Sequence, residues 1–206
     1  MLPTTYTTEE VNRLLAVVDR STRTGKRDYA VLLLATQLGL RSGDIVRLTF
    51  EKVDLAGNSI ILSQNKTDQP LTLPLLPVIR EAIEVYIEDE RPNIKSEYIF
   101  LSANAPFERV TTSSIRHALT GYFLIAGINI SGKKHGPHSL RSSLTSSMIN
   151  GGVPYEVVRR MLGHADPDAI KHYAKVDIEN LRSYAIDVPT PTGNFKALLE
   201  GRAQQW

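Results

Sequence analysis

Residues 28–48 of the chain, DYAVLLLATQLGLRSGDIVRL, combine a strongly apolar run with a polar stretch that directly follows it. The run predicts a helix over about residues 28–38 that stops at Gly39, because glycine commonly ends a helix in the left-handed conformation. A second, short helix is predicted to begin near Ser42. The stretch therefore places Arg41 between two elements that are otherwise apolar.

The segments on either side predict a mainly helical chain with one small sheet. Thr7 to Glu10 form a predicted capping box, and residues 20–27 (RSTRTGKR) are expected to be a basic, polar loop. Turn signals at Gly57-Asn58 and Asn65–Gln69 divide residues 53–75 into a predicted meander of strands. The order fits an α+β domain better than alternating βαβ units. The other predicted elements are a helix from Pro77, a short strand at 98–101 (YIFL), and helices at 112–126, 139–150, 154–162 and 177–185.

Composition narrows the class of protein. The 206 residues suffice for one well-packed domain, and the absence of cysteine excludes thiol catalysis, disulfides and Cys-based zinc sites. A formal charge of +2 permits nucleic acid as a partner without demanding it. The sequence shows no signal peptide, and no apolar run reaches the roughly 20 residues that span a bilayer. We therefore expect a cytoplasmic protein with no membrane partner.

Six polar residues stand out beside these apolar elements. Two arginines offer planar forks that suit the non-bridging oxygens of a phosphate, and histidines can donate hydrogen bonds or move protons. A lysine on a hairpin can reach a leaving oxygen. A tyrosine can attack phosphorus if cations or a base assist a hydroxyl whose pKa is about 10. The six are Arg41 in TQLGLRSGD, Lys66 in NKTDQ, His138 and Arg141 in HSLR, and His164 and Tyr173 in LGHADPDAIKHY.

Each residue alone also has an ordinary structural explanation, which is the favoured one when the residue is taken singly. Arg41 and Asp44 could form a surface ion pair, and Lys66 at a turn tip could simply be solvated. The HSLR pair could satisfy a helix N-terminus, and the LGH histidine could cap a helix C-terminus. Tyr173 could be half-buried like most of the eight tyrosines. These explanations do not account for all six residues in order at compatible spacings.

That order and spacing resemble the tyrosine recombinase (phage integrase) family, from about residue 6 to residue 188. In this resemblance Arg41 is the catalytic arginine of the first box, LATQLGLRSGDIVRL, and Asp44 is the acidic residue three positions later. Lys66 matches the family's hairpin lysine, eight residues before Pro74 in LPL. The remaining matches are the HxxR box at His138–Arg141, the LGH box at Leu162–His164, and the nucleophile Tyr173, nine residues after the LGH histidine.

The resemblance implies a tyrosine recombinase catalytic-domain fold over residues 1–188, with a small antiparallel three-stranded sheet near the N-terminal third. It implies an enzyme that breaks and rejoins DNA by transesterification. Tyr173 would form a 3′-phosphotyrosyl link, Lys66 would protonate the leaving 5′-hydroxyl, and the two arginines would clamp the phosphate oxygens. His164 would hydrogen-bond the phosphate in the transition state, and His138 would act as a general base or position the nucleophile. No cofactor, metal ion or ATP is implied.

The implied partners are double-stranded DNA carrying a recombination site and further copies of the chain, assembled as a tetramer on DNA. The implied setting is a bacterium, a phage or another mobile element. Other basic residues could contact the DNA backbone, although each one alone could belong to an ordinary solvated face. Lys133 and Lys134 are the better candidates because they lie just before the HxxR box. The remaining candidates are Arg159, Arg160, Arg23, Lys26 and Arg27.

The sequence departs from the family pattern in several places. Ser142 stands where a histidine often follows the HxxR arginine, which we interpret as a packing change that leaves the catalytic set complete. Tyr155 and Tyr184 lie near the boxes but not at the expected distance from the LGH histidine. The usual N-terminal helical domain is absent, so we expect the catalytic half of a longer protein rather than a naturally short member. Residues 189–206 are expected to be a linker and tail that either docks on a neighbouring protomer or frays.

Three alternatives stay open. The chain could be a DNA-binding or regulatory protein on an inactive domain of the same fold, although the complete set of six residues argues against this. It could be a relaxing topoisomerase of the same chemistry, although the compact LGH-to-tyrosine spacing favours a recombinase. It could also be an unrelated helical interaction domain, which would leave the cluster unexplained. The sequence does not indicate the DNA target or the element that is moved.

Overall fold

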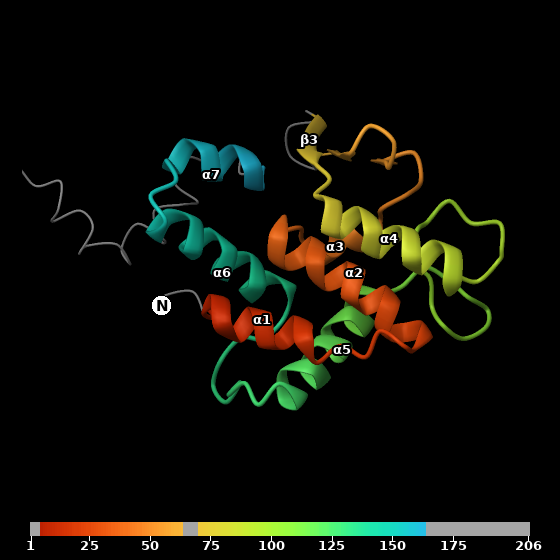
Figure 1. Ribbon diagram of the computed structural model, residues 1–206, viewed down its shortest axis with the longest axis horizontal. Coiled ribbons are helices and arrows are strands. Elements are labelled where there is room, and N and C mark those ends of the chain that lie inside the picture. The colour runs from red at the N-terminus through yellow and green to blue at the C-terminus, as the bar shows by residue number, and fades with distance from the viewer. Residues whose placement is uncertain (1–4, 64–69, 164–206) are drawn as a thin grey trace, which may run out of the picture. The chain divides into compact units, whose positions relative to one another are not determined.

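The computed structural model describes residues 5–63 and 70–163, which form a mainly helical domain with one small sheet (Figure 1). The predicted turn at 65–69, the helix from Asp177 and the tail from residue 189 lie outside the described residues. In chain order the elements are α1 (Thr8–Ala16), α2 (Arg23–Gln37), α3 (Ser42–Val46), β1 (Val53–Asp54), β2 (Ser59–Ser63), β3 (Pro70–Pro74), α4 (Pro77–Asp89), α5 (Thr112–Ile125), α6 (Pro137–Asn150) and α7 (Tyr155–Leu162).

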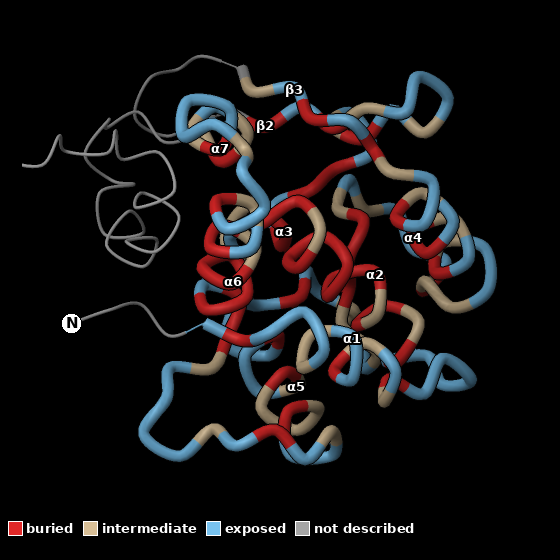
Figure 2. Tube along the Cα trace, turned by 60° about the vertical axis from the view of Figure 1, so that its left-hand side comes forward, coloured by how far each residue is buried: buried red, intermediate tan, exposed pale blue. Residues whose placement is uncertain are grey.

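Helix α2 is the centre of the hydrophobic core. Every residue from Ala30 to Thr36 is buried, and α2 contacts α1, α3, α4, α5 and α6. Figure 2 shows the buried residues in red along α2 and α6. A helix that is apolar on every side is stable only when other elements surround it. The helix ends where the sequence predicts, since Gly39 has a left-handed φ of 63°.

The start of α2 differs from the sequence prediction. Residues 23–27 were expected in a basic loop, but α2 already begins at Arg23. The Thr22 hydroxyl caps the helix by accepting a hydrogen bond from the Gly25 backbone N–H at 3.1 Å. A threonine in this place satisfies one of the free N–H groups at a helix start. The loop prediction was therefore wrong for these five residues. Their polar side chains indicated a loop, whereas the cap at Thr22 and an internal contact of Arg27 make them the start of a helix.

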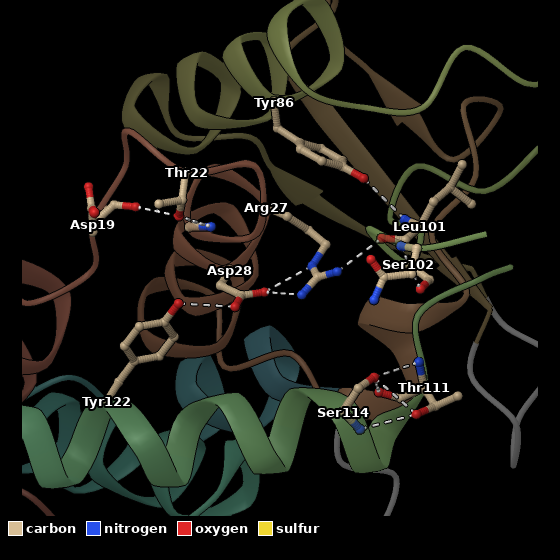
Figure 3. A network of polar contacts seen from close by, with 12 residues as sticks. Asp19, Thr22, Arg27, Asp28, Tyr86, Leu101, Ser102, Thr111, Ser114 and Tyr122 are labelled. Atoms are coloured by element: carbon tan, nitrogen blue, oxygen red, sulfur yellow. Dashed lines mark hydrogen bonds and ion pairs between the residues drawn. The ribbon is translucent and has the colours of Figure 1, made fainter. Parts of the chain in front are cut away.

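That internal contact is a buried polar network centred on Arg27 and Asp28 (Figure 3). Their side chains form an ion pair at 2.8 Å, and Arg27 donates to the Leu101 carbonyl at 3.1 Å. Tyr122 of α5 donates to the other Asp28 oxygen at 3.0 Å. Tyr86 of α4 accepts from the Leu101 N–H at 3.2 Å. The network therefore joins α2 to α4, α5 and the segment that connects them.

The sheet confirms the predicted meander. Its strands are antiparallel in the order β1-β2-β3, with Val53 opposite Ile60 and Ile60 opposite Leu73. These three side chains are buried, whereas the neighbouring Ile61 points outward and is 43% exposed. One face of the sheet therefore covers the core. The connection from β2 to β3, which carries Lys66, lies outside the described residues.

The predicted strand at 98–101 was wrong. The segment pairs only through two isolated bridges, Thr49 with Tyr98 and Leu101 with Arg109. Its backbone groups are shared between separate segments, with the Ile99 N–H donating to the Leu48 carbonyl at 3.0 Å and the Phe100 carbonyl accepting from Val110 at 3.1 Å, so no continuous ladder forms. The Arg91 guanidinium donates to three carbonyls in and just before the segment, at 3.1 Å, 2.8 Å and 3.0 Å for Ser96, Tyr98 and Ile99.

The last two described helices lie close to their predicted positions, although α6 begins two residues before the predicted start at Ser139. Helix α6 spans Pro137–Asn150, and α7 ends at Leu162 with its C-cap Gly163 in the left-handed conformation. Ile149 of α6 packs with Val158 and Leu162 of α7 in a small cluster of its own. None of the helices within residues 5–63 and 70–163 is long and apolar enough to cross a membrane.

Candidate active site

Arg41 stands at the N-cap of α3 and is exposed. Among the residues that the structure describes, its guanidinium has no hydrogen-bond or ion-pair partner. The position follows from the turn that ends α2, because Gly39 reverses the chain with its positive φ. Asp44 pairs with Arg47 at 3.1 Å, so the surface ion pair between Arg41 and Asp44 does not form. The Arg41 guanidinium therefore has five N–H donors that no described residue uses.

Arg141 is buried, with only 4% of its surface exposed. Its Nη1 donates to the Gly39 carbonyl at 2.6 Å, and its Nη2 donates to the Leu162 carbonyl at 2.6 Å. These are short, charge-assisted bonds. One guanidinium therefore links the turn before Arg41 to the last residue of α7, two positions before His164 in the sequence.

His138 lies three residues before Arg141, on the exposed side of the first turn of α6. Partial burial lowers the pKa of its imidazole, and the positive charges of Arg141, Lys134 and Arg41 lower this pKa further. The ring is therefore mostly neutral at neutral pH and can accept a proton or a hydrogen bond. Geometry places Arg141 near the same turn, because its guanidinium binds the carbonyl of Gly39, two residues before Arg41.

Ser142 occupies the position after the HxxR arginine and is buried. Its hydroxyl donates to the His138 carbonyl at 3.0 Å, within α6. The interpretation of this serine as a packing change stays a prediction.

Three of the six predicted catalytic residues, Lys66, His164 and Tyr173, lie outside the described residues, and so does Tyr184. Their roles stay predictions. The described chain ends at Gly163, one residue before the LGH histidine. The structure thus brings together Arg41, His138 and Arg141, which come from two segments almost 100 residues apart in the sequence.

The other basic candidates fall into three groups. Lys133 and Lys134 are both exposed, in the loop before α6. Arg159 and Arg160 both pair with Glu156, at 2.7 Å and 3.0 Å, and lower the pKa of that carboxyl to about 2. The remaining three do not form a free basic face: Arg23 and Lys26 pair with acidic residues of α4 and its C-cap, and Arg27 is buried.

Two residues that hold this site were not singled out from the sequence. Gly39 was recognised only as the end of a helix, whereas its carbonyl also binds Arg141. Tyr6 is buried beside α6, and its backbone N–H donates to the Ser143 hydroxyl at 2.8 Å. Its partner lies 137 residues away in the sequence, so no local pattern could have revealed the contact. Within residues 5–63 and 70–163, no three His, Asp or Glu side chains are grouped as a metal site requires.

Known proteins resemble the chain over most of its length. The Phage integrase family matches residues 5–180. The putative integrase/recombinase y4gC of Sinorhizobium fredii is 30% identical over 191 residues, which cover 91% of this chain and 97% of the relative. Tyrosine recombinase XerA of Thermococcus kodakarensis is 29% identical, over 88% of this chain and 61% of the relative.

Solved structures show the same fold. A crystal structure of XerA recombinase aligns with a TM-score of 0.72 and 25% identity, over 89% of this chain and 64% of that one. XerH site-specific recombinase, bound to a palindromic difH substrate in a post-cleavage complex, aligns with a TM-score of 0.76 and 21% identity. That alignment covers 89% of this chain and 53% of the XerH chain.

The chain belongs to the phage integrase family of tyrosine recombinases, which are enzymes that break and rejoin DNA. It spans nearly the whole of one bacterial relative but only about three-fifths of the XerA protein. The expected recombinase catalytic-domain fold is confirmed, and an unrelated helical interaction domain is excluded.

Proposed function

We propose that the chain cuts and rejoins DNA at a specific site through a 3′-phosphotyrosyl intermediate on Tyr173. The observation that carries the proposal is the cluster of Arg41, His138 and Arg141. An exposed arginine without a partner among the described residues, a neutral imidazole and a buried arginine together suit one phosphate group. Membership of the family supports the assignment of the nucleophile.

The proposed chemistry exchanges one phosphoester bond for another. The Tyr173 oxygen bonds to phosphorus while the bond from phosphorus to the 5′ oxygen breaks. The tyrosine proton passes to a base, for which His138 is the candidate, and Lys66 donates a proton to the 5′ oxygen. A 5′-hydroxyl of a partner strand then reverses these steps and releases the tyrosine. The number of ester bonds is unchanged, so the cycle needs no ATP.

The arginines supply the charge stabilisation that a metal ion supplies in other phosphoryl-transfer sites. Arg41 is positioned to bind the non-bridging oxygens with its planar fork. Arg141 is already oriented by two backbone carbonyls, so little reorganisation is needed when a phosphate arrives. His164 would add a hydrogen bond to the phosphate. Loss of one such donor typically lowers a reaction rate by about 10²–10³-fold.

The proposed partners follow from this chemistry. The substrate is double-stranded DNA, and exchange between two duplexes requires four copies of the active site, which favours a tetramer on DNA. The tail from residue 189 is the candidate contact between copies. Lys134 and Lys133 would bind backbone phosphates without specifying sequence. A DNA substrate is consistent with a cytoplasmic location in a bacterial cell.

Covalent trapping on DNA tests this function. The probe is a pool of synthetic duplexes of randomised sequence, each with a nick shortly downstream of the cleaved position. The freed 5′-hydroxyl strand then diffuses away and the protein–DNA complex accumulates. We expect a band of protein joined to DNA on a denaturing gel, and its loss in Tyr173→Phe. Tyr184→Phe is the matched control and should retain the band.

The fate of the trapped strand separates a recombinase from a relaxing topoisomerase. Adding a second duplex with a free 5′-hydroxyl should give a recombinant strand that joins the two molecules. Resealing only within the original duplex, together with relaxation of supercoiled plasmid, would support the topoisomerase instead. A protein that binds DNA but forms no covalent complex would be the inactive regulatory form.

A further inference from the structure

We propose that Tyr6 is a positioning residue for the cleavage site. It holds the basic loop, residues 131–136, so that Lys134 stands near His138. This inference rests on the proposed function, because it assigns a role within the same site. Its evidence is a set of contacts that Tyr6 makes with α5, α6 and the basic loop.

Tyr6 is anchored in the core on two sides. It is 5% exposed, and its backbone N–H donates to the Ser143 hydroxyl of α6 at 2.8 Å. Its ring packs against the ring of Phe123 in α5, with 4.7 Å between centroids. Ser143 in turn donates to the Ser139 carbonyl at 2.8 Å, so it is fixed within α6. Tyr6 is thus attached to the helix that carries His138 and Arg141.

From this anchor Tyr6 makes two contacts with consecutive residues of the basic loop. Its hydroxyl donates to the Lys134 carbonyl at 3.2 Å, and the Lys133 ammonium lies 5.6 Å from the centre of its ring. Burial, with a smaller contribution from the charge of Glu10, raises the pKa of the Tyr6 phenol. The hydroxyl therefore remains a donor throughout the physiological pH range.

A third contact ties the loop to the same aromatic group. The His135 ring meets the ring of Phe123 edge-on at 6.4 Å, and His135 Nδ1 lies 3.0 Å from the Lys133 carbonyl. The basic loop is thus held at three successive residues. These contacts add to the hydrogen bond from the Lys133 N–H to the Ile130 carbonyl at 3.0 Å.

The consequence for the site is electrostatic. The charged groups that act on His138 are Arg141, Lys134 and Arg41. Two of the three are arginines fixed by α3 and α6, whereas Lys134 depends on the basic loop. A loop released from Tyr6 would move Lys134 away, raise the pKa of His138 and remove lysine contacts from DNA.

The test compares Tyr6→Phe and Tyr6→Leu with Tyr86→Phe. Tyr6→Phe removes only the hydroxyl, and Tyr6→Leu also removes the ring face under Lys133. Tyr86→Phe is the matched control because it breaks one tyrosine hydrogen bond to a backbone group at the same 3.2 Å, far from the basic loop in the sequence. The readout is the His138 pKa, measured by NMR titration of the imidazole. It should rise in Tyr6→Leu, rise less in Tyr6→Phe, and stay unchanged in Tyr86→Phe.

Three further measurements separate positioning from general destabilisation. Affinity for a duplex of arbitrary sequence should become less dependent on salt, by a slope of about 1 for each lysine that leaves the backbone. In a Lys134→Gln background the His138 pKa should already be raised, and Tyr6→Leu should change it no further. The cleavage rate of Tyr6→Leu should fall by on the order of tenfold, within the 10²-fold that a misplacement of 1 Å can cost.

The outcomes distinguish this inference from the proposed function. An unchanged His138 pKa in a folded Tyr6→Leu protein overturns the positioning role, even if cleavage by Tyr173 is established. The positioning role is also overturned if Tyr6→Leu raises the His138 pKa as much in the Lys134→Gln background as in the wild-type protein. Conversely, covalent complex formation that survives Tyr173→Phe overturns the nucleophile but leaves the titration result standing.

Discussion

Gly39→Ala should destabilise the domain more than an ordinary glycine substitution does, because two costs coincide at this position. Gly39 has a φ of 63°, and a residue with a Cβ costs about 1–2 kcal/mol in the left-handed conformation. A Cβ at this position would lie 2.9 Å from Leu162 Cδ2 and 3.2 Å from Leu144 Cδ2. Overpacking of this kind costs about 1–3 kcal/mol. The Leu162 methyl can yield in part, so the total should be about 2–4 kcal/mol of unfolding free energy.

Gly127→Ala is the matched control for Gly39→Ala. Gly127 has a φ of 64°, and nothing lies within 4 Å of a Cβ built there. This variant should therefore show the backbone cost alone, about 1–2 kcal/mol. The difference between the two alanine variants isolates the clash with Leu162 and Leu144.

Urea unfolding followed by circular dichroism measures both variants, with free energies extrapolated linearly to water. Thermal unfolding gives a second reading, at about 2–4 °C per kcal/mol for a domain of this size. Gly39→Ala should also lower cleavage, because the displaced carbonyl binds Arg141. Equal destabilisation by the two variants would refute the close packing of the turn against α6 and α7.

Three further predictions concern the site. Arg141→Lys keeps a positive charge but can reach only one of the Gly39 and Leu162 carbonyls, so unfolding free energy should fall by about 1–3 kcal/mol for the unpaired acceptor; unchanged urea unfolding would contradict this. Lys66→Ala should stop cleavage of ordinary DNA but not of DNA with sulfur at the bridging 5′ position. A thiol has a pKa of about 8.5 and leaves without a proton donor, so failure of this rescue in a covalent-trapping gel would remove the general-acid role. The lowered pKa of His138 means that the unfolded chain binds its proton more readily, so this residue's contribution to stability is present above about pH 6.5 and is lost as pH falls through the folded pKa. His138→Gln should flatten that part of the pH–stability curve, and an unchanged slope would count against the shift.

The boundaries of the helices were largely predictable because local chemistry determines them. Pro77 begins α4, and Gly127 and Gly163 have positive φ just after α5 and α7. The start of α2 was not predictable in the same way. Arg27 and Asp28 look like surface residues in the sequence, and only contacts with Leu101 and Tyr122 make them internal. A long-range polar network overrides the local signal there.

The site shows the same division between local and distant information. The spacing of the boxes identified Arg41, His138 and Arg141 together, and the structure brings these three residues into one neighbourhood. The contacts that orient these residues could not be predicted from the sequence, because Arg141 binds the carbonyl of Gly39, 102 residues away. The role of Tyr6 could not be predicted for the same reason, since its partner Ser143 is 137 residues away. Side chains that bind phosphate follow a recognisable pattern, whereas the carbonyls and rings that orient them depend on the fold.

Mass spectrometry of the trapped protein–DNA complex identifies the residue that is joined to DNA. Trypsin should release residues 172–175, HYAK, as a separate peptide that contains Tyr173. After nuclease digestion, we expect a nucleotide joined through its 3′ phosphate to this peptide, because Tyr173 is the proposed nucleophile. A nucleotide on the peptide that contains Tyr155 or on the one that contains Tyr184 would contradict the account.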